Sequence, residues 1–357
     1  MKTYRQLYPQ VYDFENLYAS YRAARRAKRG RAEVARFEAR VEDELFRLQD
    51  ELRNETYRPG TYRNFYIYEP KKRKISAAPF RDRVVHHALV RVIEPIFERR
   101  FIFDSYACRR GKGTHRALDR CTAFVRRYRF VLQCDIAKFF PTIDHAILLT
   151  ILGRTLADER IMRLCERIVQ SGDGVLDSER DVHWFPGDDL FAPLRPQGLP
   201  IGNLTSQFWA NVYLNELDHF VKRVLKCRAY VRYADDFLLF HNDKATLHGW
   251  LAELRHFAAN RLRLLLHPTK CQVFPTANGV PFLGFHHFAT HRRLKRPVMV
   301  RFRRRLRMLQ EEYAAGRIDR EKIGASIQSW CAHAAHGNTY RLRNQILRQT
   351  VFSPAHV

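Results

Sequence analysis

The spacing of apolar and polar residues predicts a chain made mostly of helices, with a few short strands between them. Apolar side chains recur at helical spacing in six segments: 11–56, 82–97, 144–156, 203–226, 245–259 and the stretch beyond 297. Short apolar runs predict a buried strand at 130–136, a hairpin at 230–240 and a strand at 281–285, whose glycine allows another backbone to approach closely. This order of strand, helix, hairpin, helix and strand is typical of an α+β sheet layered with helices.

One segment, 171–196, departs from this pattern. It contains Ser171–Gly174, Pro186, Gly187 and Pro193 and has few apolar runs. Because glycine and proline interrupt regular elements, we expect irregular or hairpin structure there. No internal repeat or low-complexity linker divides the remainder of the chain.

The charge of the chain indicates a polyanionic partner. The 357 residues carry a formal net charge of +26, and the basic residues are clustered. Residues 21–40 contain eight Lys or Arg against two Glu, and residues 291–357 contain fifteen against four acidic residues. Clusters of one sign favour nucleic acid over an ordinary solvated surface, so binding should weaken steeply with salt.

The composition also bears on the compartment. Seven scattered cysteines with no CxxC pair indicate reduced thiols in a cytosol-like compartment. No stretch approaches the roughly 20 apolar residues that span a membrane, and no signal-peptide core follows the N-terminus. We therefore expect a cytoplasmic protein without a membrane partner.

Aspartates at the ends of the predicted strands are the candidate chemical centre. Asp235 and Asp236, in the sequence Tyr-Ala-Asp-Asp, occupy the turn of the predicted hairpin, and Asp135 ends the strand at 130–136. Three carboxylates converging on one spot repel one another unless divalent cations lie between them. Two-metal phosphoryl transfer requires such oxygen ligands, so the pattern indicates a nucleic-acid polymerase.

Two other groups of candidate ligands are weaker. Gly187-Asp188-Asp189 resembles the metal-binding triplet of RNA polymerases that copy RNA, but no predicted strands flank it and it precedes the 203–226 helix. We interpret it as a loop. Cys331, His333 and His336 have a spacing that fits no familiar metal site.

Five ordered motifs make the chain resemble reverse transcriptases from about residue 60 onward. They are Pro79–Leu89, Asp135–Phe140, Gln197–Gln207, Tyr233–Asp236 and Pro281–Phe285. The resemblance implies a right-hand polymerase fold of the α+β class. It divides the chain into an N-terminal helical extension at 1–60, fingers at 61–130, a palm with part of the fingers at 131–288, and a basic helical thumb at 289–357.

The third motif resembles a particular group within this family. Group-II-intron enzymes carry QGxxxSP before a sequence like Ala210–Leu214, and this chain reads IGxxxSQ in that register, with Ile201 and Gln207 at the two changed positions. A rival register on Gln197-Gly198 displaces that tail by four residues. The replacement is similar to the pattern of reverse transcriptases from diversity-generating retroelements.

This resemblance implies copying of a template-repeat RNA with errors at adenines, followed by mutagenic retrohoming into a target gene. It also implies a bacterial or phage origin and a basic, oligomeric accessory variability protein as partner. Ile201 can pack but cannot form the hydrogen bonds of glutamine, so selection between paired and mispaired bases should weaken by roughly 1–3 kcal/mol. Two alternatives remain open: an intron or phage-defence reverse transcriptase of ordinary fidelity, and a noncatalytic RNA-binding scaffold.

The resemblance also implies roles for individual residues. Asp135, Asp235 and Asp236, with the backbone carbonyl of Ile136, would hold two Mg²⁺ ions. Phe140 would be the steric gate against ribose, Lys270 a general acid for pyrophosphate, and the thumb would hold the RNA/cDNA duplex. Residues implied to contact the incoming dNTP are Lys71, Lys74, Phe140, Ile201, Gly202, Gln207 and Lys270, and Leu283 and Gly284 would form the primer grip.

Overall fold

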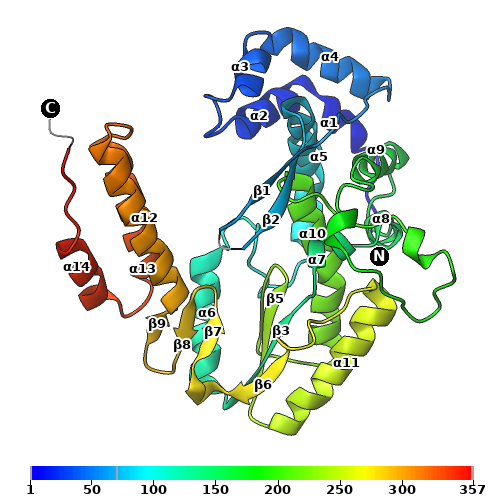
Figure 1. Ribbon diagram of the computed structural model, residues 1–357. Helices are drawn as coiled ribbons and strands as arrows, with labels where there is room; N and C mark the ends of the chain where they lie inside the picture. Colours follow the sequence, from blue (N-terminus) through cyan, green and yellow to red (C-terminus); the bar gives the residue numbers. More distant parts are fainter. Residues whose placement is uncertain (1, 70, 355–357) are drawn as a thin grey trace.

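The computed structural model describes residues 2–69 and 71–354 (Figure 1). A helical cap lies at one end, a four-stranded sheet at the centre, and a helical arm at the side. Among the described residues, no helix is both long and apolar enough to cross a membrane. The predicted helices at 82–97, 144–156 and 245–259 and the strand at 130–136 are confirmed, with ends shifted by a few residues.

The N-terminal cap consists of four short helices in place of the continuous helical stretch predicted at 11–56. They are α1 (Tyr8–Tyr12), α2 (Phe14–Ala24), α3 (Ala32–Glu38) and α4 (Val41–Arg53). Asp13 separates the first two, because its side chain accepts a hydrogen bond from the Asn16 backbone N–H at 3.1 Å and starts a new helix. Leu17 and Leu48 belong to the same hydrophobic core as the central part of the chain. The four-part division predicted from the sequence therefore remains a prediction.

A two-stranded hairpin and a long helix follow the cap. Strands β1 (Arg63–Ile67) and β2 (Arg73–Ala77) pair antiparallel, and all five residues of β1 are exposed. Helix α5 (Phe80–Glu98) buries Val84, Leu89 and other apolar side chains against the cap and the centre.

The central sheet consists of β3 (Phe130–Asp135), β4 (Tyr230–Tyr233), β5 (Asp236–His241) and β6 (Gln272–Pro275), in the order β4-β5-β3-β6 and antiparallel throughout. Val131 packs on one face with α6 (Thr114–Arg127), whereas Leu132 packs on the other with α11 (Lys244–Leu262). Both faces are thus covered by helices (Figure 1). This burial explains why the strands read as short continuous apolar runs.

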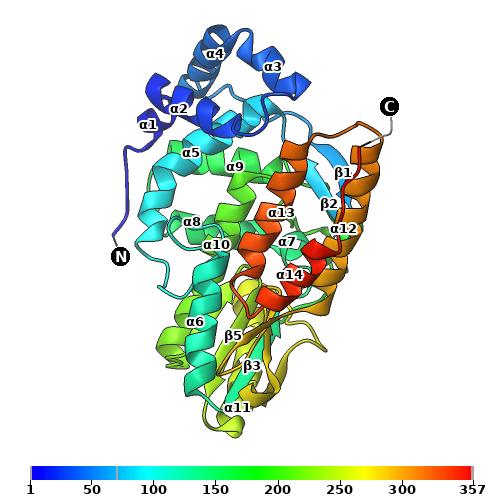
Figure 2. The ribbon, with the colours of Figure 1, turned by 90° about the vertical axis from the view of Figure 1, so that its left-hand side faces the viewer.

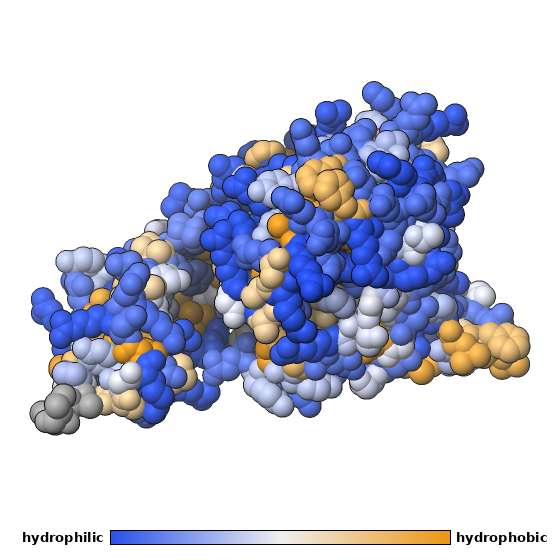
Figure 3. All heavy atoms as spheres, turned by 90° about the horizontal axis from the view of Figure 1, so that it is seen from above, coloured by the Kyte–Doolittle hydropathy of each residue, from blue (hydrophilic) through white to orange (hydrophobic). Residues whose placement is uncertain are grey.

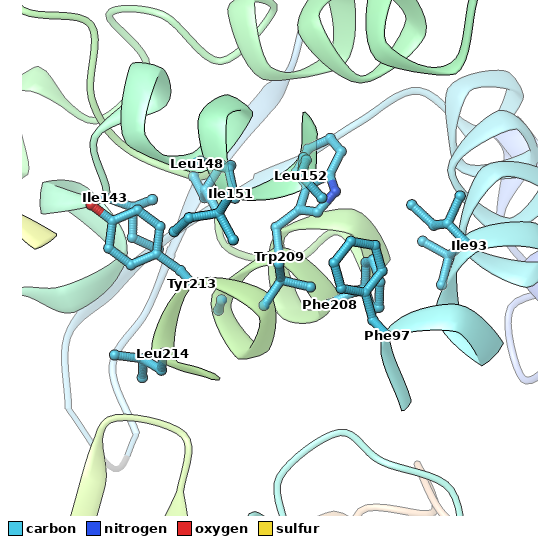
Figure 4. Close-up of a cluster of buried hydrophobic side chains, with 14 of the residues drawn as sticks. Ile93, Phe97, Ile143, Leu148, Ile151, Leu152, Phe208, Trp209, Tyr213 and Leu214 are labelled. Carbon is cyan, nitrogen blue, oxygen red and sulfur yellow. The ribbon is translucent and has the colours of Figure 1, made fainter. Parts of the chain in front are cut away.

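Helix α10 (Leu204–His219) connects the sheet to the rest of the protein and continues into a π-helical turn at Phe220–Val224. It packs against α5, α8 (His145–Gly153) and neighbouring turns, as the cluster around Trp209 shows (Figure 4). Phe208 meets Phe97 of α5 edge to face, with ring centroids 5.7 Å apart. The Tyr213 hydroxyl donates to the Leu262 carbonyl at 2.6 Å, which joins α10 to the end of α11.

The segment after α9 (Glu159–Gln170) is irregular, with only short 3₁₀ turns at Asp177–Glu179 and Ala192–Leu194, as expected for 171–196. The interpretation of Gly187-Asp188-Asp189 as a loop is confirmed. The Asp188 carboxylate forms an ion pair with Arg195 and accepts the backbone N–H of Phe185 at 2.8 Å. Asp188 therefore anchors the loop.

The single strand predicted at 281–285 is wrong, because two strands, β7 (Val280–Phe282) and β8 (Phe285–His287), meet there through a tight turn. Leu283 and Gly284 both have positive φ, 46° and 90°, so the chain reverses at these two residues. Apolar spacing alone could not reveal the reversal. The expected close approach is also wrong, because a Cβ on Gly284 would lie at ordinary contact distance, 3.6 Å, from its nearest neighbours. The backbone conformation is the reason for glycine here.

The C-terminal arm comprises β9 (Arg292–Leu294), α12 (Arg296–Ala314), α13 (Arg320–Ala334) and α14 (Tyr340–Arg348). Its three helices form a separate layer beside the sheet (Figures 1 and 2). They have a small core of their own, in which Phe302 stacks on Trp330 with centroids 3.8 Å apart.

Candidate active site

The central sheet brings the three predicted aspartates together at one edge. Asp135, the last residue of β3, is the direct partner of Asp236, the first residue of β5. Asp235 lies in the two-residue turn that joins β4 to β5, and Ala234 in the same turn has a φ of 55°. Residues directly opposite in an antiparallel pair have Cα atoms about 4.5–5.5 Å apart, so the carboxylates of Asp135 and Asp236 project from adjacent positions.

The aspartates are electrostatically coupled. Burial is the largest cause that raises the pKa of Asp236 to about 7, and the charges of Asp135 and Asp235 add to it. Burial and the charge of Asp135 likewise raise the pKa of Asp235. One buried oxygen of Asp236, Oδ1, has no hydrogen-bond partner. Ionisation of all three carboxylates therefore requires additional positive charge at this edge of the sheet.

Three cationic side chains supply part of that charge. Lys270, a predicted site residue, forms an ion pair with Asp135 through its Nζ. The positive charge of Arg73, on β2, lowers the pKa of Asp235 and so partly offsets the effect of burial. The charge of Lys295 does the same for the pKa of Asp236. Arg73 and Lys295 could not be singled out from the sequence, because each is one of several neighbouring basic residues.

The donor set fits a hard divalent cation. Carboxylate oxygens are the ligands that Mg²⁺ prefers, and Asp236 Oδ1 is buried without a partner. In the described residues, 2–69 and 71–354, no group of three His, Cys, Asp or Glu side chains is close enough together to coordinate a metal ion. Two backbone bonds, from His267 N to Asp135 O at 2.8 Å and from Ala137 N to Leu265 O at 2.9 Å, flank Ile136, and neither uses the Ile136 carbonyl. Its predicted role as a metal ligand stays a prediction.

A buried ion pair holds the turn that carries Asp235. Arg232 lies on β4 and Asp218 on α10, and both side chains are fully buried. Two guanidinium nitrogens of Arg232 donate to the Asp218 carboxylate at 2.7 and 2.6 Å. Arg232 also donates to the Ala234 carbonyl at 3.2 Å and to Asn211 Oδ1 at 3.1 Å. The position of the turn thus depends on α10, through a contact that no local motif in the sequence indicates.

The segment around Ile201 is joined to β2. The Ser76 N–H donates to the Ile201 carbonyl at 2.9 Å, and Asn203 Nδ2 donates to the Ser76 carbonyl at 2.9 Å. Gly202 has a φ of 119°, and a Cβ there would lie 2.9 Å from Ile75 Cγ2. The backbone at 201–203 is therefore held against the strand that carries Arg73.

The other residues predicted to contact the dNTP differ in burial. Phe140 is half-buried against Phe139, with ring centroids 5.4 Å apart, while Lys71 and Gln207 are exposed. The Lys74 ammonium donates to the Val175 carbonyl at 2.8 Å, on the irregular segment. Their roles at the nucleotide stay predictions.

The predicted primer-grip residues form the tip of the β7–β8 hairpin. The Gly284 carbonyl accepts the Lys295 backbone N–H at 2.9 Å, which links the tip to the start of α12. The half-buried Lys295 therefore lies at the junction between the hairpin and the helical arm.

The histidines near the end of α13 have a further neighbour from α6. His336 stacks on His115, with ring centroids 3.6 Å apart, and His333 lies 6.3 Å from His115. Cys331, two residues before His333, is half-buried. The contact connects the helical arm to α6 through aromatic packing.

The fold and the aspartate cluster are those of a template-copying polymerase of the right-hand, α+β type. Residues 68–287 match the family model "Reverse transcriptase (RNA-dependent DNA polymerase)". Since the match covers more than half of the chain, this protein belongs to the reverse transcriptase family, whose members are RNA-directed DNA polymerases.

Two curated proteins and one solved structure are similar to parts of this chain. The chain is 28% identical over 286 residues to protein YkfC of Escherichia coli K12, covering 69% of this chain and 72% of that protein. It is 23% identical over 309 residues to the group II intron-encoded protein LtrA of Lactococcus lactis, covering 68% of this chain and 49% of LtrA. The chain thus spans about half the length of LtrA. A solved structure of telomerase from Candida albicans aligns with a TM-score of 0.44 and 12% identity, covering 83% of this chain and 56% of that chain.

Proposed function

We propose that this reverse transcriptase copies a template-repeat RNA into cDNA with errors at adenines, as the enzymes of diversity-generating retroelements do. The observation that carries the proposal is Ile201 in the IGxxxSQ sequence. The side chain at 201 belongs to a backbone joined to β2, so its position is set by hydrogen bonds to Ser76 that do not depend on its chemistry. Replacing glutamine by isoleucine there changes what the site can recognise rather than where the residue lies.

The loss of recognition follows from the groups on the side chain. Glutamine can donate and accept hydrogen bonds near the nascent base pair, whereas isoleucine offers only packing. A mispaired nucleotide then loses less relative to a paired one, by roughly 1–3 kcal/mol, which is about 5- to 150-fold in selectivity. The preference for errors at adenine is taken from the resemblance to the retroelement enzymes.

The proposed chemistry places Asp135, Asp235 and Asp236 around two Mg²⁺ ions. When bound, these ions would activate the primer 3′-hydroxyl and neutralise the triphosphate and the leaving pyrophosphate. Lys270, beside Asp135, would donate a proton to the pyrophosphate. Arg73, which acts on Asp235 from β2, would face the triphosphate.

Further side chains would select and hold the substrates. Lys71, Lys74, Gly202 and Gln207 would complete the nucleotide site, and Phe140 would exclude ribonucleotides. The Leu283–Gly284 turn would hold the primer end. These assignments extend the family resemblance to the positions described above.

A groove of the helical arm, lined mainly by α12 and α13 with Glu69 from the β1–β2 loop at its border, would contact the RNA/cDNA duplex. Its volume is about 690 Å³, and its lining includes Glu69, Arg301, Arg305 and Trp330. Seen from above, a hollow separates the arm from the rest of the protein, and hydrophilic side chains dominate its surroundings (Figure 3). Basic side chains can contact phosphates without reading bases, as expected for an A-form duplex. The accessory variability protein and the cytoplasmic location belong to the same proposal.

Primer extension on an adenine-rich RNA tests the proposal. Wild type, Asp235→Ala and Ile201→Gln would be given dNTPs and Mg²⁺, with cognate RNA and any accessory protein present, and the products sequenced. We expect adenine-biased errors from wild type, fewer errors from Ile201→Gln, and no synthesis by Asp235→Ala. Errors that do not change in Ile201→Gln would contradict the role given to Ile201.

A second candidate is an intron-type reverse transcriptase of ordinary fidelity. The similarity to LtrA, an intron-encoded protein, favours it. The same assay separates the two, because accurate synthesis by wild type would support this candidate. No synthesis by wild type in the full mixture would support a noncatalytic RNA-binding scaffold.

A further inference from the structure

Two thiols lie directly behind the catalytic edge of the sheet. Cys134 precedes Asp135 in β3, and Cys271 follows Lys270 just before β6. The strands β3 and β6 pair antiparallel with Gln133 opposite Gln272, so one further step of this register places Cys134 opposite Cys271. Side chains of directly opposite residues point to the same face of a sheet.

The two thiols occupy facing positions on neighbouring strands. Cys271 Sγ donates to the carbonyl of Asp135, the residue after Cys134, at 3.7 Å. Directly opposite residues in an antiparallel pair have Cα atoms about 4.5–5.5 Å apart, which lies within the range of about 4.4–6.8 Å that a disulfide spans. A bond between the two sulfurs therefore requires only a small local movement.

The residues between the two pairing regions loop out toward Asp135. The His267 N–H donates to the Asp135 carbonyl, whereas Cys271 lies opposite Cys134, so the backbone of residues 268–270 is not paired with β3. Lys270 ends this loop, and its ammonium contacts the Asp135 carboxylate. Any shift of Cys271 is transmitted through one peptide bond to Lys270.

We propose that Cys134 and Cys271 form an oxidative modification site, in which a hydroperoxide converts the two thiols to a disulfide. Cys271 is 7% exposed as a residue, whereas Cys134 is fully buried, so the Cys271 sulfur attacks a peroxide oxygen first and becomes a sulfenic acid as water leaves. The fully buried Cys134 then attacks that sulfur, and the sulfenic oxygen leaves as a second water. The two thiols lose two electrons and two protons, and the hydrogen peroxide gains both.

The disulfide would slow nucleotide addition by moving Lys270 relative to Asp135. This consequence rests on the proposed polymerase function, whereas formation of the bond does not. A displacement of about 1 Å at a reacting group can reduce a rate on the order of 100-fold. We therefore expect a loss of at least about tenfold in primer extension, restored by a dithiol reductant.

Peptide mapping and primer extension on the full chain test the proposal. Reduced wild type would be treated with hydrogen peroxide, digested without reductant and mapped by mass spectrometry, while a parallel sample is assayed before and after dithiothreitol. Cys271→Ser and Cys134→Ala remove one partner each, and Cys108→Ser, at an exposed cysteine, is the matched control. We expect the linked Cys134–Cys271 peptide and reversible inhibition in wild type and Cys108→Ser, and neither in the other two variants.

The outcomes are distinct. Absence of the linked peptide at peroxide levels that oxidise Cys108 would overturn the site. A linked peptide with unchanged primer extension, or equal inhibition of Cys271→Ser, would overturn the effect on catalysis. A reduced chain without any polymerase activity would instead contradict the proposed function, and the peptide map would still decide whether the bond forms.

Discussion

Asp218→Asn should strongly destabilise the protein, because it leaves the Arg232 guanidinium buried without a counter-charge. Both side chains are fully buried, and the pair is joined by two hydrogen bonds of 2.7 and 2.6 Å. Tyr230 donates a third bond to the same carboxylate at 2.8 Å. Breaking a buried ion pair by removing one partner costs about 3–5 kcal/mol, against a total stability of about 5–15 kcal/mol for a native protein.

Urea unfolding followed by circular dichroism measures this change. Glu216→Gln is the matched control, because Glu216 lies two residues away on α10 and pairs with Arg154 at 3.1 Å on the surface. Exposed pairs contribute about 1 kcal/mol or less, so the control should unfold almost as wild type does. The double variant Asp218→Leu with Arg232→Met should lose less stability than Asp218→Asn, since no unpaired charge remains.

The same variant should also lose activity at temperatures where it stays folded. Arg232 donates to the carbonyl of Ala234, so a displaced guanidinium no longer holds the turn that carries Asp235. We expect primer extension to fall about tenfold or more. If Asp218→Asn unfolds within about 1 kcal/mol of Glu216→Gln, the reasoning about the buried pair is refuted.

Three further predictions concern the site and its supports. In the metal-free chain, burial and the neighbouring carboxylates raise the pKa of Asp236 from 3.8 to about 7. Wild type should therefore lose stability as the pH rises through this range. In urea unfolding, the free energy of unfolding of Asp236→Asn relative to wild type should increase by a few kcal/mol between pH 4 and 8. Lys270→Met should reduce kcat for primer extension about 100-fold or more, as expected for loss of a general acid. Gly202→Ala should destabilise the protein by about 1–3 kcal/mol, because φ is 119° and the added Cβ would clash with β2. Gly249→Ala, at an open position on α11, should stabilise the protein by about 0.5–1 kcal/mol. Urea unfolding measures both changes.

Each of these predictions has a contrary outcome. A constant stability difference between wild type and Asp236→Asn from pH 4 to 8 would show that Asp236 titrates normally. A loss of kcat in Lys270→Met of less than about tenfold would limit that lysine to pairing with Asp135. Equal effects of the two glycine substitutions would mean that the backbone at 202 relaxes freely.

The sequence by itself determined the elements and the candidate chemistry. The apolar run at 130–136 and the hairpin around Asp235 were predictable because continuous apolar runs and turn residues act locally, whichever elements pack against them. The net charge indicated a polyanionic partner for the same reason, since it depends on composition alone. The ordered motifs then indicated a reverse transcriptase, and the family match over residues 68–287 confirms it.

Only the tertiary structure decided how these parts meet. The pairing of Asp135 with Asp236 depends on a strand register set by residues about a hundred positions apart. Lys270, named from the sequence, does pair with Asp135, but the charges of Arg73 and Lys295 reach the site only because β2 and the start of α12 pack near it. The Lys74 side chain instead bonds to the irregular segment. Long-range packing selects among conformations that local spacing leaves equivalent, and for that reason the sequence could name the aspartates and Lys270 but not Arg73 or Lys295.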